Sequence, residues 1–265
     1  EAPLTKDLAG PYLAGRVAAT DSNFNAAADY YLRALKQDPG ASFISDSALV
    51  SLLASGQMDR AIQMADDLSQ PDAATPPSQI VGLVERSKLA REQDWDGLIA
   101  VLDTARTEEE GAEKLFDGML RAWALLGQGK ASEADAAFLE MRKVRGTEGL
   151  VEYHRALSKA LVGDFEGAAE LLQTEAPETN LIGAIAQAQV LAQLDRRDDA
   201  IAMLEKIGGN GVDSTIDDLI VRLKSPEPVP FDFVKDPRDG IAQVFLTFAT
   251  LLDSDVEPTP LALIH

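Results

Sequence analysis

The sequence predicts an all-α protein made of about six similar helix-turn-helix repeats, followed by further helices. Three observations support this prediction. A pattern of residue types recurs about every 34 residues along the chain. Alanine is abundant and aromatic residues make up only 6% of the 265 residues, and small side chains allow helices to pack closely. No stretch shows the convincing alternation of apolar and polar residues that is typical of a strand.

The repeat is clearest when the sequence is aligned on one anchor position in each repeat. The anchors are Ala27, Ala61, Leu98, Ala134, Ala168 and Ala200, which by subtraction lie 34, 37, 36, 34 and 32 residues apart. Three residues before the anchors are Phe24, Met58, Trp95, Ala131, Phe165 and Arg197. Four residues after the anchors are Tyr31, Ala65, Leu102, Phe138, Leu172 and Leu204. A turn-forming residue is expected about five residues before each anchor.

Each repeat is expected to contain two helices. The first occupies roughly the dozen residues before the turn, and the second begins at the turn. Side chains of Asp21, Asp94 and Asp164 can accept hydrogen bonds from the free N–H groups at the start of a second helix. Helix-breaking residues then end the second helices. These are Pro39, Pro71, Gly146 and Pro177.

The pattern loosens after Gly208. The stretch "TIDDLIVRLKS" predicts a short helix, and the proline-rich stretch around "PVPFDFV" predicts an irregular connection. The apolar residues from Ile241 to Asp253 predict a buried helix, and "PTPLALIH" predicts the start of another, with Thr259 as its cap. We therefore expect a repeat array over residues 1–208 and a less regular helical continuation over 209–265, as the start of further repeats in a longer protein.

Over residues 9–208 the pattern resembles that of tetratricopeptide repeat (TPR) proteins. Ala27, Tyr31, Ala34 and Pro39 match the second helix and terminal proline of that family. The small residue of the first helix, twelve before the anchor, is matched by Gly15, Ala122, Ala156 and Ala188. The third repeat departs from the pattern, with Leu98 as its anchor and Arg86 in the small position, so its helices are expected to cross differently. The resemblance implies a right-handed α-solenoid in which neighbouring helix pairs share their apolar faces.

In TPR proteins the first helices line a concave face, and here they carry an apolar stripe. The resemblance makes this stripe a candidate groove for a helical or extended segment of a partner. The candidate residues are Leu83, Met119, Trp123, Leu126, Tyr153 and Leu157, with Arg121 and Arg155 placed to orient carboxylates at the rim. Two alternatives stay open: the stripe is simply core, with the arginines in a solvated charge ladder, or the groove is filled by the chain's own segment around 241–252.

Residue types that carry chemistry are scarce. The chain has no cysteine and two histidines, His154 and His265, so a zinc site has almost no ligands. No nucleophile motif is present, and "GQGKAS" fits a turn between helices better than a phosphate loop. We therefore expect a non-enzymatic protein, with no metal and no cofactor, that acts as a protein-binding scaffold or as an architectural module of a longer chain.

The net charge of −20 limits the classes of molecule that the chain is expected to bind. It disfavours nucleic acid and anionic membrane surfaces, and no apolar run of about 18 residues predicts a membrane span. The expected partner is another protein or peptide, including a second copy of the chain. Because the sequence starts "EAPLTKDLAG" without Met, either a leader was removed or the chain begins inside a longer protein. Periplasmic and cytoplasmic locations both stay open, with export favoured.

Overall fold

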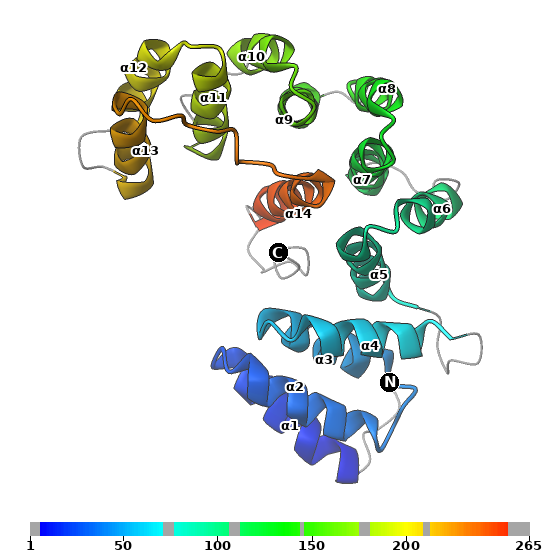
Figure 1. The fold of residues 1–265 in the computed structure, drawn as a ribbon. Coiled ribbons are helices and arrows are strands. Elements are labelled where there is room, and N and C mark those ends of the chain that lie inside the picture. The colour runs from blue at the N-terminus through cyan, green and yellow to red at the C-terminus, as the bar shows by residue number, and fades with distance from the viewer. Residues whose placement is uncertain are drawn as a thin grey trace. The chain divides into compact units, whose positions relative to one another are not determined.

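The structure of the chain is a computed structural model, and it describes residues 6–70, 77–105, 112–143, 146–174, 181–208 and 213–253. All regular secondary structure in these ranges is α-helical, which confirms the predicted all-α class (Figure 1). The helices are α1 Lys6–Thr20, α2 Phe24–Leu35, α3 Ser42–Ala54, α4 Met58–Leu68, α5 Gln79–Glu92, α6 Trp95–Ala105, α7 Ala112–Gly127, α8 Ala131–Met141, α9 Glu148–Leu161, α10 Phe165–Thr174, α11 Leu181–Gln193, α12 Arg197–Ile207, α13 Ser214–Lys224 and α14 Pro237–Asp253. None of these described helices is long and apolar enough to span a membrane.

The helices pack in sequential pairs, as the repeat predicts. Within a pair, α1 contacts α2, α7 contacts α8, α9 contacts α10 and α11 contacts α12. First helices of successive pairs also touch, as α7 does with α9 and α9 with α11. Each pair therefore buries its apolar face against its neighbours, which is how helix pairs too small to form a core of their own are stabilised.

The six anchor residues occupy equivalent places in the structure. Each is the fourth residue of a second helix, in α2, α4, α6, α8, α10 and α12. Each is fully buried, with 0% of its surface exposed. Each donates its N–H to the carbonyl oxygen four residues earlier, at 2.9 to 3.2 Å. The residues four positions later, from Tyr31 to Leu204, are all buried as well. The alignment made from sequence is therefore also an alignment in space.

The turns inside the pairs share one backbone conformation. Five residues before each anchor, the chain has a left-handed residue: Ser22, Gly56, Gln93, Gly129, Gly163 and Asp195, with φ between 56° and 87°. In the fourth pair, Gly129 donates its N–H to the oxygen of Leu126 at 2.9 Å and Lys130 donates to Leu125 at 3.0 Å. This arrangement satisfies the last carbonyls of the first helix, and it confirms the turn-forming position expected from sequence.

The predicted helix caps are confirmed at two of three positions. Asp94 and Asp164 each accept the N–H of the residue three positions later, Gly97 and Gly167, at 3.0 Å. The prediction for Asp21 is wrong. The cap of α2 is Asn23, whose Oδ1 accepts the N–H of Ala26 at 3.3 Å. Asp21 precedes the left-handed residue of the turn, whereas a capping side chain must come directly before the helix.

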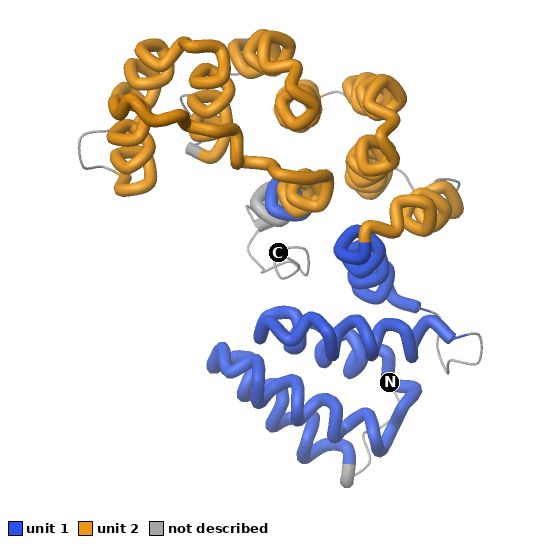
Figure 2. The backbone as a smooth tube through the Cα atoms, in the orientation of Figure 1, with its two compact units in different colours: residues 1–92, 245–265 blue, residues 93–244 orange. Residues whose placement is uncertain are grey.

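The chain divides into two compact units, shown in blue and orange in Figure 2. Unit 1 comprises residues 1–92 and 245–265, and unit 2 comprises residues 93–244. One boundary falls between α5 and α6, in the helix pair whose small position holds Arg86. The other falls within α14. The predicted division at residue 208 stays a prediction about the repeat pattern.

The region after the repeats follows the expected order of elements. The predicted short helix is α13, and residues 225–236 connect it to α14 without regular secondary structure. In α14, Ile241 and Val244 are buried, as predicted. The expected breakers Pro71 and Pro177 and the expected terminal helix at 258–265 lie outside the described residues.

Candidate protein-binding surface

Seven of the eight candidate groove residues lie on two neighbouring helices of unit 2. Helix α7 carries Met119, Arg121, Trp123 and Leu126, and α9 carries Tyr153, Arg155 and Leu157. The eighth, Leu83, lies on α5 in unit 1. The structure therefore places seven of the candidates on two first helices that contact each other, and Leu83 on a helix of the other unit. We call the seven residues on α7 and α9 the candidate patch.

The apolar members of this patch are mostly covered. Met119, Trp123 and Leu157 are fully buried, and Leu126 is 8% exposed. Tyr153 is half-buried. Trp123 packs edge-on against Phe138 of α8, with 5.9 Å between ring centroids. Their role in binding a partner stays a prediction, and it requires that whatever covers them moves away.

The two candidate arginines already have carboxylate partners on second helices. Arg121 Nε lies 3.0 Å from Asp103 of α6. Arg155 Nε lies 2.6 Å from Asp135 of α8, and its Nη1 lies 3.3 Å from Glu152. The bond to Asp135 is the main reason that the pKa of Arg155 is raised. These arginines therefore fasten first helices to the preceding second helices.

A buried histidine lies behind the patch. Trp123 donates its indole N–H to Nδ1 of His154 at 3.2 Å. Because Nδ1 accepts this bond, the neutral imidazole carries its proton on Nε2, and Nε2 is buried without a hydrogen-bond partner. Burial lowers the pKa of His154 to about 3. A general base needs a pKa nearer the working pH and access to a substrate, so His154 is a packing residue.

Two residues of the patch, Trp123 and Tyr153, are contacted by the chain's own C-terminal part. We call residues 225–244 the covering segment, and we call the surface formed by α7, α9 and α11 of unit 2, together with Arg197 at the start of α12, the first-helix surface. Gly240 of α14 lies directly on Trp123: a Cβ atom added there would be 2.3 Å from the indole ring. Tyr153 donates its hydroxyl to Oε1 of Gln243 at 3.5 Å. Burial raises the pKa of Tyr153, so the hydroxyl keeps its proton at neutral pH.

The extended half of the covering segment is held through its main chain. Gln189 Oε1 accepts the N–H groups of Asp232 and Phe233, both at 3.0 Å, and its Nε2 donates to Oδ1 of Asp232 at 2.6 Å. Gln193 donates to the carbonyl oxygen of Val229 at 2.6 Å. In Figure 1 this segment runs from α13 past α11 to α14.

Arg197 holds the start of the covering segment. Its guanidinium donates to the carbonyl oxygens of Ser225 at 2.6 Å and Glu227 at 3.0 Å. Charged donors make stronger hydrogen bonds than neutral ones. Together with Gln189 and Gln193, Arg197 aligns the extended chain along α11 and the start of α12.

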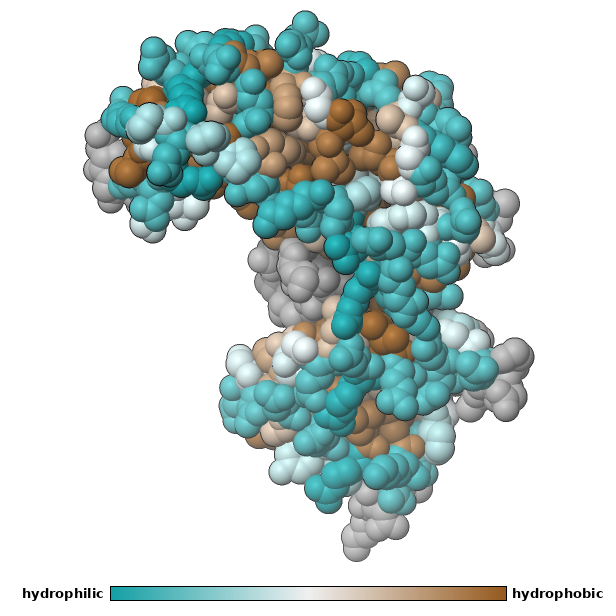
Figure 3. Space-filling model, viewed as in Figure 1, coloured by the Kyte–Doolittle hydropathy of each residue, from teal (hydrophilic) through white to brown (hydrophobic). Residues whose placement is uncertain are grey.

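Apolar side chains of the covering segment fill gaps between helix pairs. Val229 belongs to the core formed by α11, α12 and α13. Phe231 packs against the alanine-rich core of α9, α10 and α11, with its ring 6.1 Å from that of Phe165. Figure 3 shows apolar residues gathered around α9 on the visible face of unit 2. The covering segment is thus bound by both apolar burial and main-chain hydrogen bonds.

Sequence reasoning missed Gln189, Gln193, Arg197 and Gly240 as functional residues. Two of them left a signal. Gln189 lies eleven residues before its anchor, as Trp123 and Leu157 do, and Arg197 departs from an otherwise uncharged column. Three residues before the anchors the chain has Phe24, Met58, Trp95, Ala131 and Phe165, and then the charged Arg197. That departure marks the place where a helix pair contacts an extended chain in place of another helix pair.

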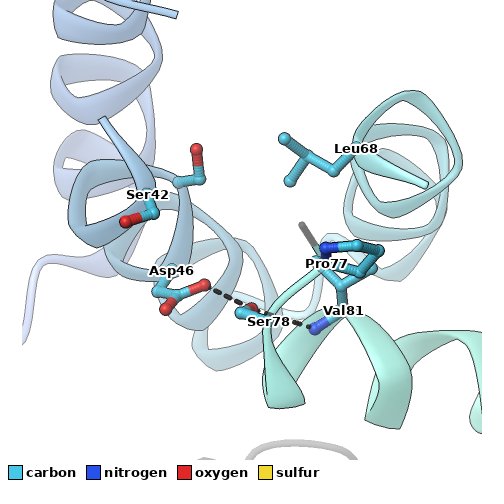
Figure 4. A pocket seen from close by; sticks show the side chains of 7 residues that line it. Ser42, Asp46, Leu68, Pro77, Ser78 and Val81 are labelled. Carbon is cyan, nitrogen blue, oxygen red and sulfur yellow. Dashed lines mark hydrogen bonds between the residues drawn. The ribbon is translucent and has the colours of Figure 1, made fainter. Parts of the chain in front are cut away.

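Two cavities are found among the described residues, and the one in unit 2 includes the candidate residue Leu126 in its lining. In unit 1, a space of about 10 Å³, enough for about one water molecule, is lined by Ser42, Ser45, Asp46, Leu68, Pro77, Ser78 and Val81 (Figure 4). There Ser78 donates to Asp46 at 2.5 Å and accepts the N–H of Val81, which joins the start of α5 to α3. In unit 2, a cavity of about 310 Å³ is lined by Leu126, Ala131, Ser132, Asp135, Ser158, Lys159, Val162 and Asp164. Within the described ranges, no group of three or more His, Asp or Glu side chains is placed to hold a metal ion.

No protein-family model matches the chain, and no curated protein matches it. Among solved structures, the chain is similar to one in "Structure of Naa15/Naa10 bound to HypK-THB", with 14% sequence identity and a TM-score of 0.42. The match covers 93% of this chain and 42% of that chain, so this chain spans about two fifths of its length. A likeness at this level is no evidence of a shared partner.

Proposed function

We propose that the chain is a non-catalytic, TPR-like scaffold that binds another protein through the first-helix surface of unit 2. The observation that carries the proposal is that this surface holds a polypeptide in the structure. Gln189, Gln193 and Arg197 bind main-chain atoms of the covering segment. Groups that bind main-chain atoms are equally suited to a segment of another protein.

The apolar candidates supply the other half of a binding surface. Trp123 of α7 and Leu157 of α9 are large, fully buried side chains of the helices that form this surface, and Tyr153 of α9 is half-buried. Aromatic side chains with a polar tip are frequent anchors at protein interfaces. Arg121 and Arg155 are already paired with Asp103 and Asp135, so in this proposal they position α7 and α9 and do not contact the partner.

The second candidate function is an architectural module whose groove is filled by its own C-terminal segment. The contact of Gly240 with Trp123 and the bond between Tyr153 and Gln243 favour it. In that case the covering segment is a permanent part of the fold, and partners bind elsewhere or not at all.

Site-specific photo-crosslinking separates the two candidates. A photoreactive phenylalanine analogue is introduced at position 153 of the full chain, and at exposed Glu170 on the second helix α10 as a control. The scaffold proposal expects a crosslinked partner protein from position 153 in the native source and none from position 170. Crosslinks from position 153 only to residues of the covering segment would instead support the architectural module.

A further inference from the structure

We infer that residues 225–244 are a displaceable internal ligand, and that the first-helix surface fits a partner segment of the same pattern. That partner is an extended peptide with apolar side chains at alternate positions, followed by a helical turn with a small residue. The inference rests on the proposed function, because it names the partner and the regulation of the same surface. Binding of the partner then requires the internal ligand to leave.

From 229 to 233 the burial pattern of the covering segment is that of a bound extended peptide. Val229 is buried and Phe231 and Phe233 are half-buried, whereas Pro230 and Asp232 between them are exposed; the buried Val234 ends this alternation. Successive side chains of an extended chain point to opposite sides, so alternate residues enter the surface. Such alternation is how extended peptide ligands are usually read by their receptors.

The prolines keep this stretch extended. Pro226, Pro228 and Pro230 lack the N–H group that a helix needs, and each disfavours the helical conformation of the residue before it. A peptide with this spacing of prolines loses less conformational freedom when it binds than a flexible one does. The covering segment is therefore suited to act as a ligand in its own right.

Most hydrogen bonds between the surface and the covering segment do not depend on the sequence of the ligand, although the bond from Tyr153 to the side chain of Gln243 does. Of the six that Gln189, Gln193 and Arg197 make to the covering segment, only the bond from Gln189 Nε2 to Asp232 involves a side chain of that segment. The remaining five involve backbone N–H and C=O groups. A second chain in the same register offers the same groups, so specificity is left to the apolar positions and to Gly240.

Gly240 sets the steric requirement. Its Cα leaves no room for a side chain, because an added Cβ would approach Trp123 to 2.3 Å. A partner peptide therefore needs a glycine at this position, nine residues after the position of Phe231. This requirement distinguishes the inferred ligand from a general apolar peptide.

Covalent attachment explains why the covering segment occupies the surface by default. A tethered ligand acts at an effective concentration of about the millimolar range. A free peptide must compete with the tethered segment at this effective concentration, so the wild-type chain is expected to bind such a peptide weakly. Changes that loosen the covering segment are expected to raise the affinity for a free peptide.

The test follows the covering segment in the full chain by distance measurement between two spin labels. Because the chain has no cysteine, Glu170→Cys and Lys235→Cys place the labels uniquely, at two exposed positions of unit 2. The probe is a synthetic peptide with the sequence of residues 225–244. The expected result is that excess peptide adds a second population of longer distances, whereas a scrambled peptide does not.

Gly240→Val is expected to have opposite effects on displacement when it is made in the chain and when it is made in the peptide. Gly240→Val in the chain loosens the covering segment and increases displacement at a given peptide concentration. The same change in the peptide reduces displacement, and Phe231→Ser in the peptide reduces its apparent affinity about tenfold, as expected for losing a half-buried aromatic ring. The exposed Pro230→Ser in the peptide serves as the matched control and is expected to change little.

An unchanged distance in wild type and in Gly240→Val at millimolar peptide, with both chains folded by circular dichroism, overturns the inference. If Gly240→Val does not fold, the peptide variants against the wild-type chain decide the question. Intermolecular distances between singly labelled chains would identify a second copy as the occupant and would also overturn it. A partner crosslinked from position 153 while the label distance stays constant leaves the proposed function standing and refutes only the internal ligand.

Discussion

At the scale of single residues, His154 is a titratable group that the fold removes from water. It is fully buried on α9, accepts one hydrogen bond from Trp123, and has no partner at Nε2. Its pKa of about 3 means that the folded chain keeps this ring neutral under conditions where the unfolded chain charges it. His154 therefore makes the stability of unit 2 depend on pH in the acidic range.

We expect the free energy of unfolding to fall as the pH decreases from about 6.5 towards 3. The folded pKa of His154 is depressed, so below pH 6.5 the unfolded state binds a proton that the folded state does not. The loss approaches about 1.4 kcal/mol for each pH unit within that window. Urea unfolding of wild type and His154→Gln at pH 7, 6 and 5 measures it as a difference in slope.

The matched control for this experiment is His265→Gln, which changes the other histidine of the chain. Carboxylates with lowered pKa, such as Asp164 beside Lys159, lose their contribution only at lower pH and are common to all variants. Equal pH slopes for wild type and His154→Gln would show that His154 is accessible or charged in the folded chain.

The left-handed turn residues make a second prediction at this scale. Ser22 has φ of +56°, which a residue with a Cβ adopts at a cost of about 1–2 kcal/mol. Ser22→Gly removes that strain but makes the unfolded chain more flexible, so we expect a net gain of about 0.5–1 kcal/mol. Thermal unfolding measures the change.

The control for Ser22→Gly is the reverse substitution at Gly56. Gly56 occupies the same place in the next pair, at φ +72°, with no atom within 4 Å of an added Cβ. Gly56→Ser therefore changes backbone strain without a clash, and we expect it to destabilise the chain by a similar amount. A stabilising Gly56→Ser, or a destabilising Ser22→Gly, would contradict the assignment of these turns.

At the scale of helices, the anchor column sets how closely the two helices of a pair approach. Ala134 is fully buried in α8, and Ala136 on the same helix is exposed. We expect Ala134→Leu to lower the free energy of unfolding by about 1–3 kcal/mol through overpacking. Ala136→Leu is the control, with an expected change within about 0.5 kcal/mol. Urea unfolding compares the two, and equal effects would mean that the anchor does not lie between helices.

The helices and their register were predictable because residues close together in the sequence of each repeat indicate them. The anchor, an apolar residue four positions later and a turn position five residues before recur in every repeat, so the turn position was expected even where it holds the polar Gln93 or Asp195. The failure at Asp21 came from its neighbour Asn23, which was two positions closer to the helix.

The covering segment was less predictable because its contacts are long-range and occur once. Gln189 and Asp232 are 43 residues apart in sequence, and no periodic pattern connects them. No sequence pattern marks Gly240, because its contact with Trp123 forms only in the folded chain. The candidate stripe was correctly assigned to first helices, but whether a core or a groove results depends on these unrepeated contacts.

At the scale of the whole molecule, the two units are expected to unfold in separate steps. Both tryptophans, Trp95 and Trp123, belong to unit 2, whereas helices occur in both units. Arrays of helix pairs lose cooperativity at weak junctions. Urea unfolding followed by tryptophan fluorescence and by far-ultraviolet circular dichroism should therefore give different midpoints. Coincident curves would show that the two units unfold as one.

The main-chain hydrogen bonds made by Gln189, Gln193 and Arg197 have a consequence for how this protein can diverge. They bind backbone N–H and C=O groups, which every residue except proline provides, so most substitutions at the exposed positions 230 and 232 leave these bonds intact, although a change at 232 removes the side-chain bond to Gln189. Related chains are then expected to differ freely at those sites, while glutamine, arginine and glycine persist at 189, 197 and 240. Successive substitutions during evolution could thereby change the affinity of the covering segment for the first-helix surface in small steps, without changes in the helices that it contacts.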